Sequence, residues 1–153
     1  MNNAYAEEAK MMLSSKGYKL TRPRLVILDY MAGVSGHPSI QEIYEGILIN
    51  YSGIGIATVY RTIDLLVEIG YLRALVLLNN QLRYELNLPD DHHHHLICKA
   101  CGVIREFNSC NFNSISEEIE DTTCFKIEEH NLEAYGYCSD CLSKKAGYST
   151  ENM

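Results

Sequence analysis

Apolar residues recur every three or four positions in three successive stretches of the first half of the chain, a spacing typical of amphipathic helices. The first stretch begins at Thr21, a favoured N-cap residue, and has Pro23 in its first turn. The second begins at Ser39, which has capping-box spacing to Glu42, and the third ends at Gly70. We therefore predict three consecutive helices, preceded by a weaker one in the opening residues. Their apolar stripes contain Leu25, Leu28 and Met31, then Ile40, Ile43, Tyr44, Ile47 and Leu48, and finally Val59, Ile63, Leu66 and Val67.

The apolar pattern changes after Gly70 to two strand-like runs within LRALVLLNNQLRYEL. Asn79 and Asn80 separate these runs, and asparagine tolerates the positive φ angles of a tight hairpin turn. Three helices followed directly by a two-stranded hairpin predict a winged helix-turn-helix domain over residues 1–87.

The second half of the chain has a mixed pattern of strands and helix. Strand-like runs lie at 94–98 and 103–107, a helical stripe contains Ile115 and Ile119, and a long extended run covers 125–137. We expect a small α/β domain over residues 88–153, joined to the first domain by a hinge near Leu88, Pro89 and Asp90. The predicted fold class of the whole chain is α+β.

Charge is divided unevenly between the two halves. The formal net charge of −7 would by itself disfavour a nucleic-acid partner, because phosphate binding depends on Lys and Arg. However, residues 1–86 contain eight basic and eight acidic residues, whereas residues 87–153 contain five basic and twelve acidic ones. The first half can therefore still present a basic surface. The chain shows neither a signal-peptide pattern nor the roughly 20 consecutive apolar residues of a membrane helix, so we expect a cytoplasmic protein without a membrane partner.

The third predicted helix, in IATVYRTIDLLVEIG, is a candidate for reading DNA. Its apolar face is expected to leave Thr58, Arg61, Thr62 and Leu65 turned outward. When such a helix enters a major groove, arginine contacts guanine or phosphate, and hydroxyl groups contact the backbone. An ordinary amphipathic helix with a solvated face is the alternative. The candidate DNA contacts are Thr58, Tyr60, Arg61 and Thr62 on this helix, with Arg22 and Arg24 at the start of an earlier one.

Four of the six cysteines form two C-x-x-C pairs. The pairs are Cys98 with Cys101 in CKAC and Cys138 with Cys141 in CSDC. Each short turn can direct two thiolates at one ion, and two such pairs complete the tetrahedral sulfur shell that zinc accepts. We predict a structural zinc site, with two disulfides or four unligated thiols as the less favoured alternatives. Cys110 and Cys124 lack paired spacing and are interpreted as ordinary core or surface thiols.

Four consecutive histidines, His92 to His95, precede the first cysteine pair in DDHHHHLICKAC. Side chains alternate along a strand, so His93 and His95 are expected on one face and His92 and His94 on the other. Imidazole combined with carboxylate suits Fe(II), Mn(II), Zn(II) or Ni(II). A solvated histidine loop is the alternative. Further candidate ligands are Glu106 in the next strand, Glu85 at the end of the hairpin, and His37 in the turn GHPS.

Taken together, these motifs resemble the ferric uptake regulator family of metal-dependent bacterial repressors. The resemblance covers LTRPR, GHPS, IATVYRTIDLL, RYEL, HHHHLICKACGVIREF and EEHNLEAYGYCSDC, which span nearly the whole chain. It implies a homodimer in which each subunit pairs a winged-helix DNA-binding domain with an α/β dimerisation domain. Such a dimer binds AT-rich palindromic operators when its regulatory metal is present.

The resemblance also implies roles for individual residues. It implies that Cys98, Cys101, Cys138 and Cys141 hold structural zinc, and that His37, Glu85, His93, His95 and Glu106 hold the regulatory metal. His92 and His130 match a further metal site of some members, although His94 and Asn113 stand where members often place carboxylates. Tyr60 and Arg61 match the DNA contacts of the recognition helix.

The resemblance further indicates which signal is sensed. Peroxide-sensing relatives have an aspartate at the position of Glu106. Zinc-sensing relatives tend to have a cysteine in the regulatory site, and this chain has none there. The expected function is an Fe(II)-dependent repressor of iron-uptake genes, with a zinc-, manganese- or peroxide-responsive regulator as the alternative. A zinc metallohydrolase with its metal on His93, His95 and Glu106 is the alternative from another class. A metal-storage or purely structural zinc protein is a third, and for the regulator no small-molecule substrate is expected.

Overall fold

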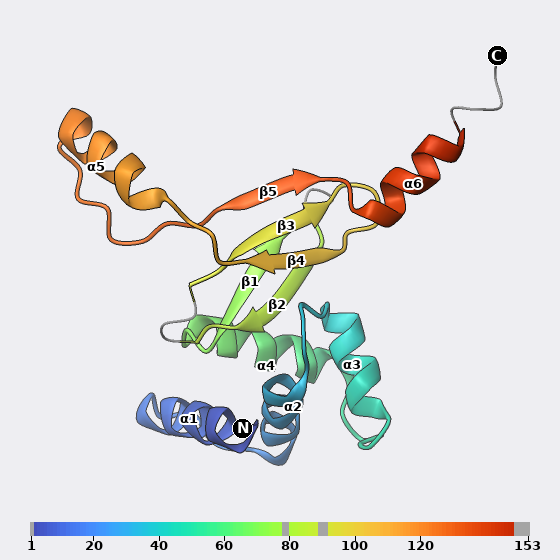
Figure 1. Ribbon diagram of the computed structural model, residues 1–153. Helices are drawn as coiled ribbons and strands as arrows, with labels where there is room; N and C mark the ends of the chain where they lie inside the picture. The colour runs from blue at the N-terminus through green and yellow to red at the C-terminus, as the bar shows by residue number, and fades with distance from the viewer. Residues whose placement is uncertain (1, 78–79, 89–91, 149–153) are drawn as a thin grey trace. The chain divides into compact units, whose positions relative to one another are not determined.

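The computed structural model describes residues 2–77, 80–88 and 92–148, which belong to two compact units, residues 1–91 and 92–153 (Figure 1). Each unit is described by itself. Pro89 and Asp90, two of the three residues of the predicted hinge, lie outside the described residues. Among the described residues, no helix is both long enough and apolar enough to cross a membrane.

The first unit consists of four helices followed by a two-stranded antiparallel hairpin. The helices are α1 (Asn2–Ser15), α2 (Arg22–Gly33), α3 (Ile40–Leu48) and α4 (Ile56–Glu68), and the strands are β1 (Leu72–Val76) and β2 (Leu82–Leu86). The hairpin pairs Leu72 with Leu86 and Val76 with Leu82. The predicted winged helix-turn-helix arrangement is confirmed.

Local signals place the ends of these elements. Ser39 caps α3 with a complete capping box, in which its hydroxyl accepts from the backbone N–H of Glu42 and the Glu42 carboxylate accepts from the backbone N–H of Ser39. Thr21 is the N-cap residue of α2, but its side chain makes no capping hydrogen bond. Gly70 follows α4 with a φ of +82°, and Asn80 has a φ of +59° in the hairpin turn. Asn79, the other predicted turn residue, lies outside the described part of the chain.

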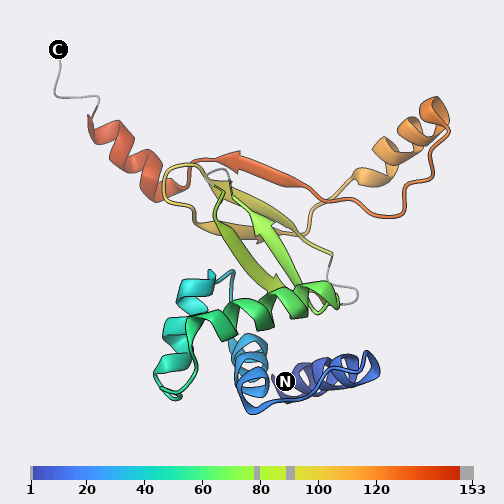
Figure 2. The same cartoon turned by 180° about the vertical axis from the view of Figure 1, so that it is seen from behind.

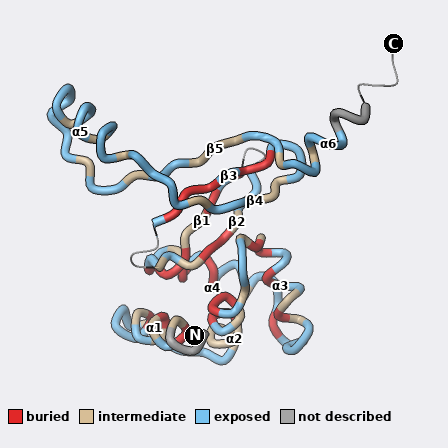
Figure 3. Tube along the Cα trace, in the orientation of Figure 1, coloured by how far each residue is buried: buried red, intermediate tan, exposed pale blue. Residues whose placement is uncertain are grey.

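The core of the first unit lies where the four helices meet the hairpin. Figure 3 shows buried segments in α2, α3 and α4 and along the hairpin. Burying one leucine, isoleucine or methionine side chain stabilises the folded state by about 1.5–3 kcal/mol. The close approach of α2 and α3 requires Gly46, because a Cβ atom there would overlap the ring of Tyr30. Fully buried core side chains include Leu13, Ile27, Leu28, Met31, Ile43, Ile63 and Leu66.

The second unit is built around a three-stranded sheet in the order β4-β3-β5 (Figure 2). Its elements are β3 (His94–Cys98), β4 (Ile104–Phe107), α5 (Phe112–Thr123), β5 (Glu133–Gly136) and α6 (Ser139–Tyr148). The central strand β3 runs antiparallel to β4 and parallel to β5. Both predicted strands and the predicted helix are present, which confirms the α+β class.

Two features of the second unit differ from expectation. The extended run predicted over 125–137 forms a strand only at Glu133–Gly136, because this is the part that pairs with β3. Helix α6 was not predicted, since its sequence SDCLSKKAGY has no apolar stripe. Helix α5 has no buried residue, although Ile115 and Ile119 face one way along it.

Candidate functional site

The four cysteines of the two C-x-x-C pairs converge in the second unit. Cys98 ends β3 and Cys101 follows in the adjoining turn, whereas Cys138 lies directly before α6 and Cys141 lies in its first turn. Their sulfur atoms all lie within 4.8 Å of one another. The turn closes with a hydrogen bond from the backbone N–H of Gly102 to the carbonyl of Cys98, at 2.9 Å. The predicted grouping is therefore present, and the cysteines are not joined as disulfides.

The surroundings of this cluster favour a thiolate. Backbone N–H groups, first that of Cys138, donate toward the sulfur of Cys98 and lower the pKa of its thiol to about 6. Hydrogen bonds with the neighbouring sulfurs, first Cys138 and then Cys101, favour the protonated thiol of Cys141 and raise its pKa to about 12, so Cys141 resists ionisation beside the Cys98 thiolate. A divalent cation removes this conflict, because all four sulfurs can then be thiolates. The donor set fits zinc.

In the first unit, a histidine and a glutamate form a buried pair. The Nε2 atom of His37 lies 2.8 Å from the Oε2 atom of Glu85, and the other carboxylate oxygen lies 3.0 Å from the Nε atom of Arg73. Arg73 and Glu85 are direct cross-strand partners in the hairpin. The sequence predicts no role for Arg73. Its pairing with Glu85 follows from the register of the hairpin strands, which places the two residues opposite each other.

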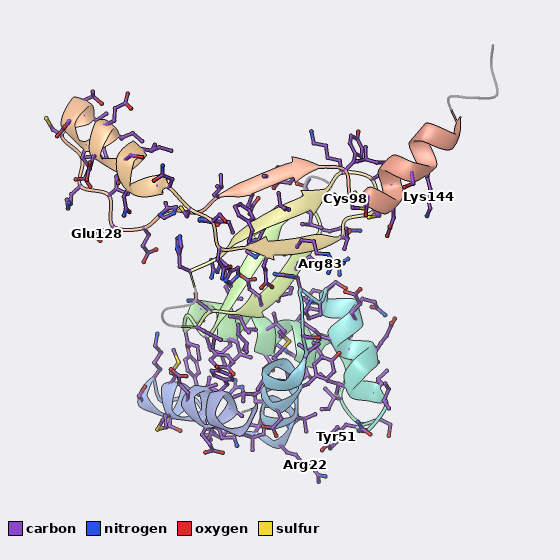
Figure 4. All side chains as sticks on the ribbon, viewed as in Figure 1. Arg22, Tyr51, Arg83, Cys98, Glu128 and Lys144 are labelled. Atoms are coloured by element: carbon purple, nitrogen blue, oxygen red, sulfur yellow. The ribbon has the colours of Figure 1, made fainter. Side chains whose placement is uncertain are left out.

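The turn that carries His37 is attached to the hairpin by hydrogen bonds. The backbone N–H of Tyr84 donates to the carbonyl of Pro38 at 3.0 Å. Arg83 donates to the carbonyl of His37 at 3.4 Å and also bonds to the carboxylate of Glu42 in the α3 capping box; it is labelled in Figure 4. These contacts hold His37 beside Glu85, so both predicted ligands of this unit lie together.

In the second unit, His93 and His95 form the corresponding pair. Their rings are edge to face with centroids 4.9 Å apart, which confirms the predicted alternation along the strand. Glu106 is the direct antiparallel partner of His95, so its side chain lies on the same face of the sheet. Each unit therefore presents imidazole and carboxylate groups at neighbouring positions, a donor set that fits Fe(II), Mn(II) or Zn(II).

A second histidine group in this unit includes residues that sequence reasoning missed. One ligand atom from each of four side chains lies within 4.8 Å of the other three. Two of the four, His94 and Cys110, had no predicted role. Burial, followed by the neighbouring histidines, lowers the pKa of His94, which favours its neutral form. The group consists of His92, His94, Cys110 and His130.

The exposed face of α4 carries two of the predicted DNA contacts. Tyr60 is 49% exposed, and Arg61 beside it is exposed, with its Nε atom donating to the carbonyl of Ala57 at 3.2 Å. Thr58 is half-buried. These positions leave the guanidinium and phenol groups directed outward for contact with a partner.

The expected outward placement of Thr62 and Leu65 is wrong. Thr62 is 3% exposed and Leu65 is 7% exposed, because the hairpin also packs against α4 and widens its buried face. The true exposed stripe passes through Ala57, Arg61 and Asp64.

The two arginines at the start of α2 differ in their surroundings. Arg22 is exposed and points away from the helices in Figure 4. Arg24 is half-buried and donates to the carbonyl of Lys19 at 2.7 Å. Arg24 also lies over the ring of Tyr18, 5.9 Å from its centroid.

Comparisons with known proteins give a consistent result. The sequence model of the ferric uptake regulator family matches residues 15–135. The peroxide-responsive repressor PerR of Staphylococcus aureus strain USA300 is 30% identical over 138 residues, which are 90% of this chain and 92% of the repressor.

Solved structures also match over most of the chain. The Helicobacter pylori ferric uptake regulator Fur has a TM-score of 0.81 at 24% identity, covering 93% of this chain and 94% of that one, and this likeness concerns the fold. A ferric uptake regulator from Francisella tularensis with iron has a TM-score of 0.74 at 32% identity, covering 82% of this chain and 96% of that one.

Proposed function

Since the chain belongs to the ferric uptake regulator family of metal-responsive transcriptional regulators, we propose that it is a cytoplasmic, Fe(II)-dependent repressor that binds palindromic, AT-rich operators of iron-uptake genes as a homodimer. It is a regulator and not an enzyme, so the metallohydrolase alternative is discarded. The observation that carries the proposal is a pair of incomplete metal-binding groups, one in each unit. Neither group alone supplies enough ligands for a closed shell.

We assign one regulatory ion to both groups. His37 and Glu85 would hold it from the first unit, and His93, His95 and Glu106 from the second. When bound, the ion supplies a shared ligand shell that fixes the two units relative to each other. The ion favours the DNA-competent state only to the extent that it binds that state more tightly. The contacts that hold His37 beside Glu85 reduce the cost of ordering this half of the shell.

Tyr60 and Arg61 are the residues we assign to the operator. Both are exposed on α4, and Arg22 and Arg24 at the start of α2 are assigned to flanking phosphates. We also assign Thr58 to the DNA backbone. We assign no DNA contact to Thr62, because its side chain is buried. In a homodimer, two copies of α4 would read the two halves of a palindrome.

The apolar surface of the second unit supports the homodimer. Helix α5 buries none of its residues, yet Ile115 is 52% exposed and Phe125 just after the helix is 74% exposed. Single exposed apolar residues are ordinary, but several on one helix and the segment after it, Ile119 among them, are what a dimer interface would bury. Light scattering should give twice the 17.4 kDa chain mass, and Ile115→Glu should give monomers. Ile49→Glu, at an exposed apolar position of the first unit, is the matched control and should remain dimeric.

Glu106 supports iron over peroxide as the signal, because the resemblance associates aspartate at this position with peroxide sensing. The similarity to the Staphylococcus aureus peroxide-responsive repressor favours the second candidate, a peroxide response. To distinguish them, Fe(II)-loaded protein is treated with hydrogen peroxide and analysed by peptide mass spectrometry. An iron sensor should leave His37, His93 and His95 unmodified, whereas a peroxide sensor should gain oxygen on one of them.

Operator binding tests the metal switch. Zinc-loaded protein is titrated anaerobically and separately with Fe(II), Mn(II) and Zn(II) at fixed salt, and operator binding is followed by gel shift. Fe(II) or its stand-in Mn(II) should produce binding, and Glu85→Gln should weaken that response. Glu45→Gln is the matched control, because Glu45 is an exposed glutamate of α3 whose side chain accepts a hydrogen bond from Gln41. Equal operator binding with and without metal would refute the switch.

A further inference from the structure

The buried pair of His37 and Glu85 has a third member, Arg73, which is not a metal ligand. Arg73 and Glu85 are direct partners across the hairpin, so their side chains stand on the same face of β1 and β2. The side chains of His37 and Glu85 are 6% and 7% exposed, and that of Arg73 is 29% exposed. All three residues belong to the first unit, so the arrangement depends on that unit alone.

The two carboxylate oxygens of Glu85 have different neighbours. Its Oε2 atom lies 2.8 Å from the Nε2 atom of His37, the other predicted metal ligand of this unit. Its Oε1 atom lies 3.0 Å from the Nε atom of Arg73. One oxygen therefore faces a fellow ligand, whereas the other is already engaged by a cation. Glu85 can offer the first oxygen to a metal ion while Arg73 keeps the second.

The charge of Arg73 acts in opposite directions on the metal-free and the metal-bound site. A guanidinium group keeps its positive charge throughout the pH range in which proteins are folded. Without metal, this charge compensates the buried carboxylate of Glu85, which would otherwise be costly to keep ionised. With metal, two cations share one carboxylate and repel each other, and the burial of the site leaves little water to screen that repulsion. Arg73 therefore stabilises the metal-free site and opposes the binding of a divalent cation.

The second arginine of the hairpin, Arg83, differs from Arg73 in its partner. Arg83 lies two residues before Glu85 in β2 and donates to the carbonyl of His37 at 3.4 Å. Its guanidinium is bonded to the carboxylate of Glu42, which compensates its charge. The charge of Arg73, by contrast, is paired with the metal ligand itself. The alternative is an ordinary cross-strand ion pair that only stabilises the hairpin, and it predicts no gain of metal affinity when Arg73 is neutralised.

We propose that Arg73 sets the affinity of the regulatory site for its metal ion, by holding one oxygen of Glu85 and placing a positive charge beside the ion. This inference rests on the proposed function, which assigns His37 and Glu85 to the regulatory ion. Arg73 is a positioning residue that weakens metal binding and thereby raises the metal concentration at which the regulator responds. Removing its charge should therefore strengthen metal binding, whereas removing a residue that only holds Glu85 in place would weaken it.

Calorimetric titration of the full-length, zinc-loaded protein with Mn(II) tests the assignment. The binding event that Glu85→Gln weakens identifies the regulatory ion. Arg73→Gln and Arg73→Met both remove the charge, and the methionine keeps an unbranched stem; each should lower the Kd for Mn(II) about tenfold. Arg73→Lys keeps the charge and should stay within about twofold of the wild-type Kd. Lys16→Gln removes the same charge from an exposed position after α1 and is the matched control, with an unchanged Kd.

Thermal unfolding of the same variants provides a second readout. Before Mn(II) is added, Arg73→Gln should have a lower Tm than the wild-type protein, because Glu85 loses its partner. The same Mn(II) concentration should then raise the Tm of Arg73→Gln more than that of the wild-type protein, since stabilisation by a ligand grows as its Kd falls. An unchanged or higher Kd in both neutral variants would overturn the proposal, as would a Kd for Arg73→Lys as low as that for Arg73→Gln. Wild-type Mn(II) binding by Glu85→Gln would instead contradict the regulatory site itself, and this inference with it.

Discussion

Replacing Arg61 with alanine removes the exposed cation that we assign to operator recognition. Arg61 lies on the solvent face of α4 beside Tyr60, and its Nε atom donates to the carbonyl of Ala57 at 3.2 Å. This bond is one turn back along the helix, and the side chain stays exposed to solvent. The substitution leaves the packed side of α4 unchanged, so its effect on folding should stay within about 0.5 kcal/mol.

The size of the effect follows from the contact that each subunit makes with the operator. A bidentate contact from arginine to guanine is worth about 1–3 kcal/mol. A homodimer presents Arg61 twice, so the operator complex should be weakened by about 2–6 kcal/mol. This corresponds to a roughly 30-fold to 20,000-fold weaker Kd, since 1.4 kcal/mol is a factor of about ten.

Fluorescence anisotropy of a labelled operator at several salt concentrations separates the two possible targets of Arg61. A phosphate contact in each subunit would reduce the salt slope of log K by about 1.8, because each neutralised phosphate contributes about 0.9. A base contact would leave the slope unchanged and remove discrimination against a mutated operator. Arg105→Ala, which removes the same charge from exposed strand β4, is the control and should bind normally. The same Kd for Arg61→Ala and Arg105→Ala would refute the assignment of α4 as the recognition helix.

Three further substitutions test the local structure. Cys138→Ser should release the structural zinc and lower Tm by about 10 °C or more in calorimetry, because 1 kcal/mol is worth roughly 2–4 °C in a chain of this size; retention of one zinc per subunit in that variant would contradict the four-cysteine site. Ser39→Ala should cost about 1 kcal/mol of unfolding free energy in urea titration by removing the α3 cap, whereas Ser39→Asp should be nearly neutral. Cys124→Gly should stabilise the protein by about 1 kcal/mol, because Cys124 has a φ of +59° at the end of α5; a lower Tm in this variant would contradict that backbone conformation.

Periodicity and capping signals predicted most of the first unit. The complete capping box at Ser39 and Glu42 and the positive φ of Gly70 and Asn80 were all readable from residue type and spacing. Thr62 was placed wrongly because a helical wheel assumes one buried side. Helix α4 contacts both the other helices and the hairpin, and this tertiary packing decides the burial of Thr62.

Ligands that are close in space but distant in the sequence could not be predicted from the sequence alone. The C-x-x-C spacing reveals each thiol pair, so the four-cysteine grouping was predictable. Cys110 has no such local signal, since its partner His130 lies twenty residues along the chain and is reached only after α5 turns the chain back. His94 had no role for the same reason. The pairing of Arg73 with Glu85 becomes apparent only when the hairpin register is known.

The central claim is that one ion and the operator favour the same state of the protein, and thermodynamic linkage gives its most direct test. Mn(II) affinity is measured by calorimetry on zinc-loaded protein, with and without saturating operator DNA at fixed salt. If metal strengthens operator binding by a given factor, operator must strengthen metal binding by the same factor, typically about 5–150-fold. We predict this increase for the wild-type protein and its loss in His93→Ala. An Mn(II) affinity that is the same with and without operator would contradict the account.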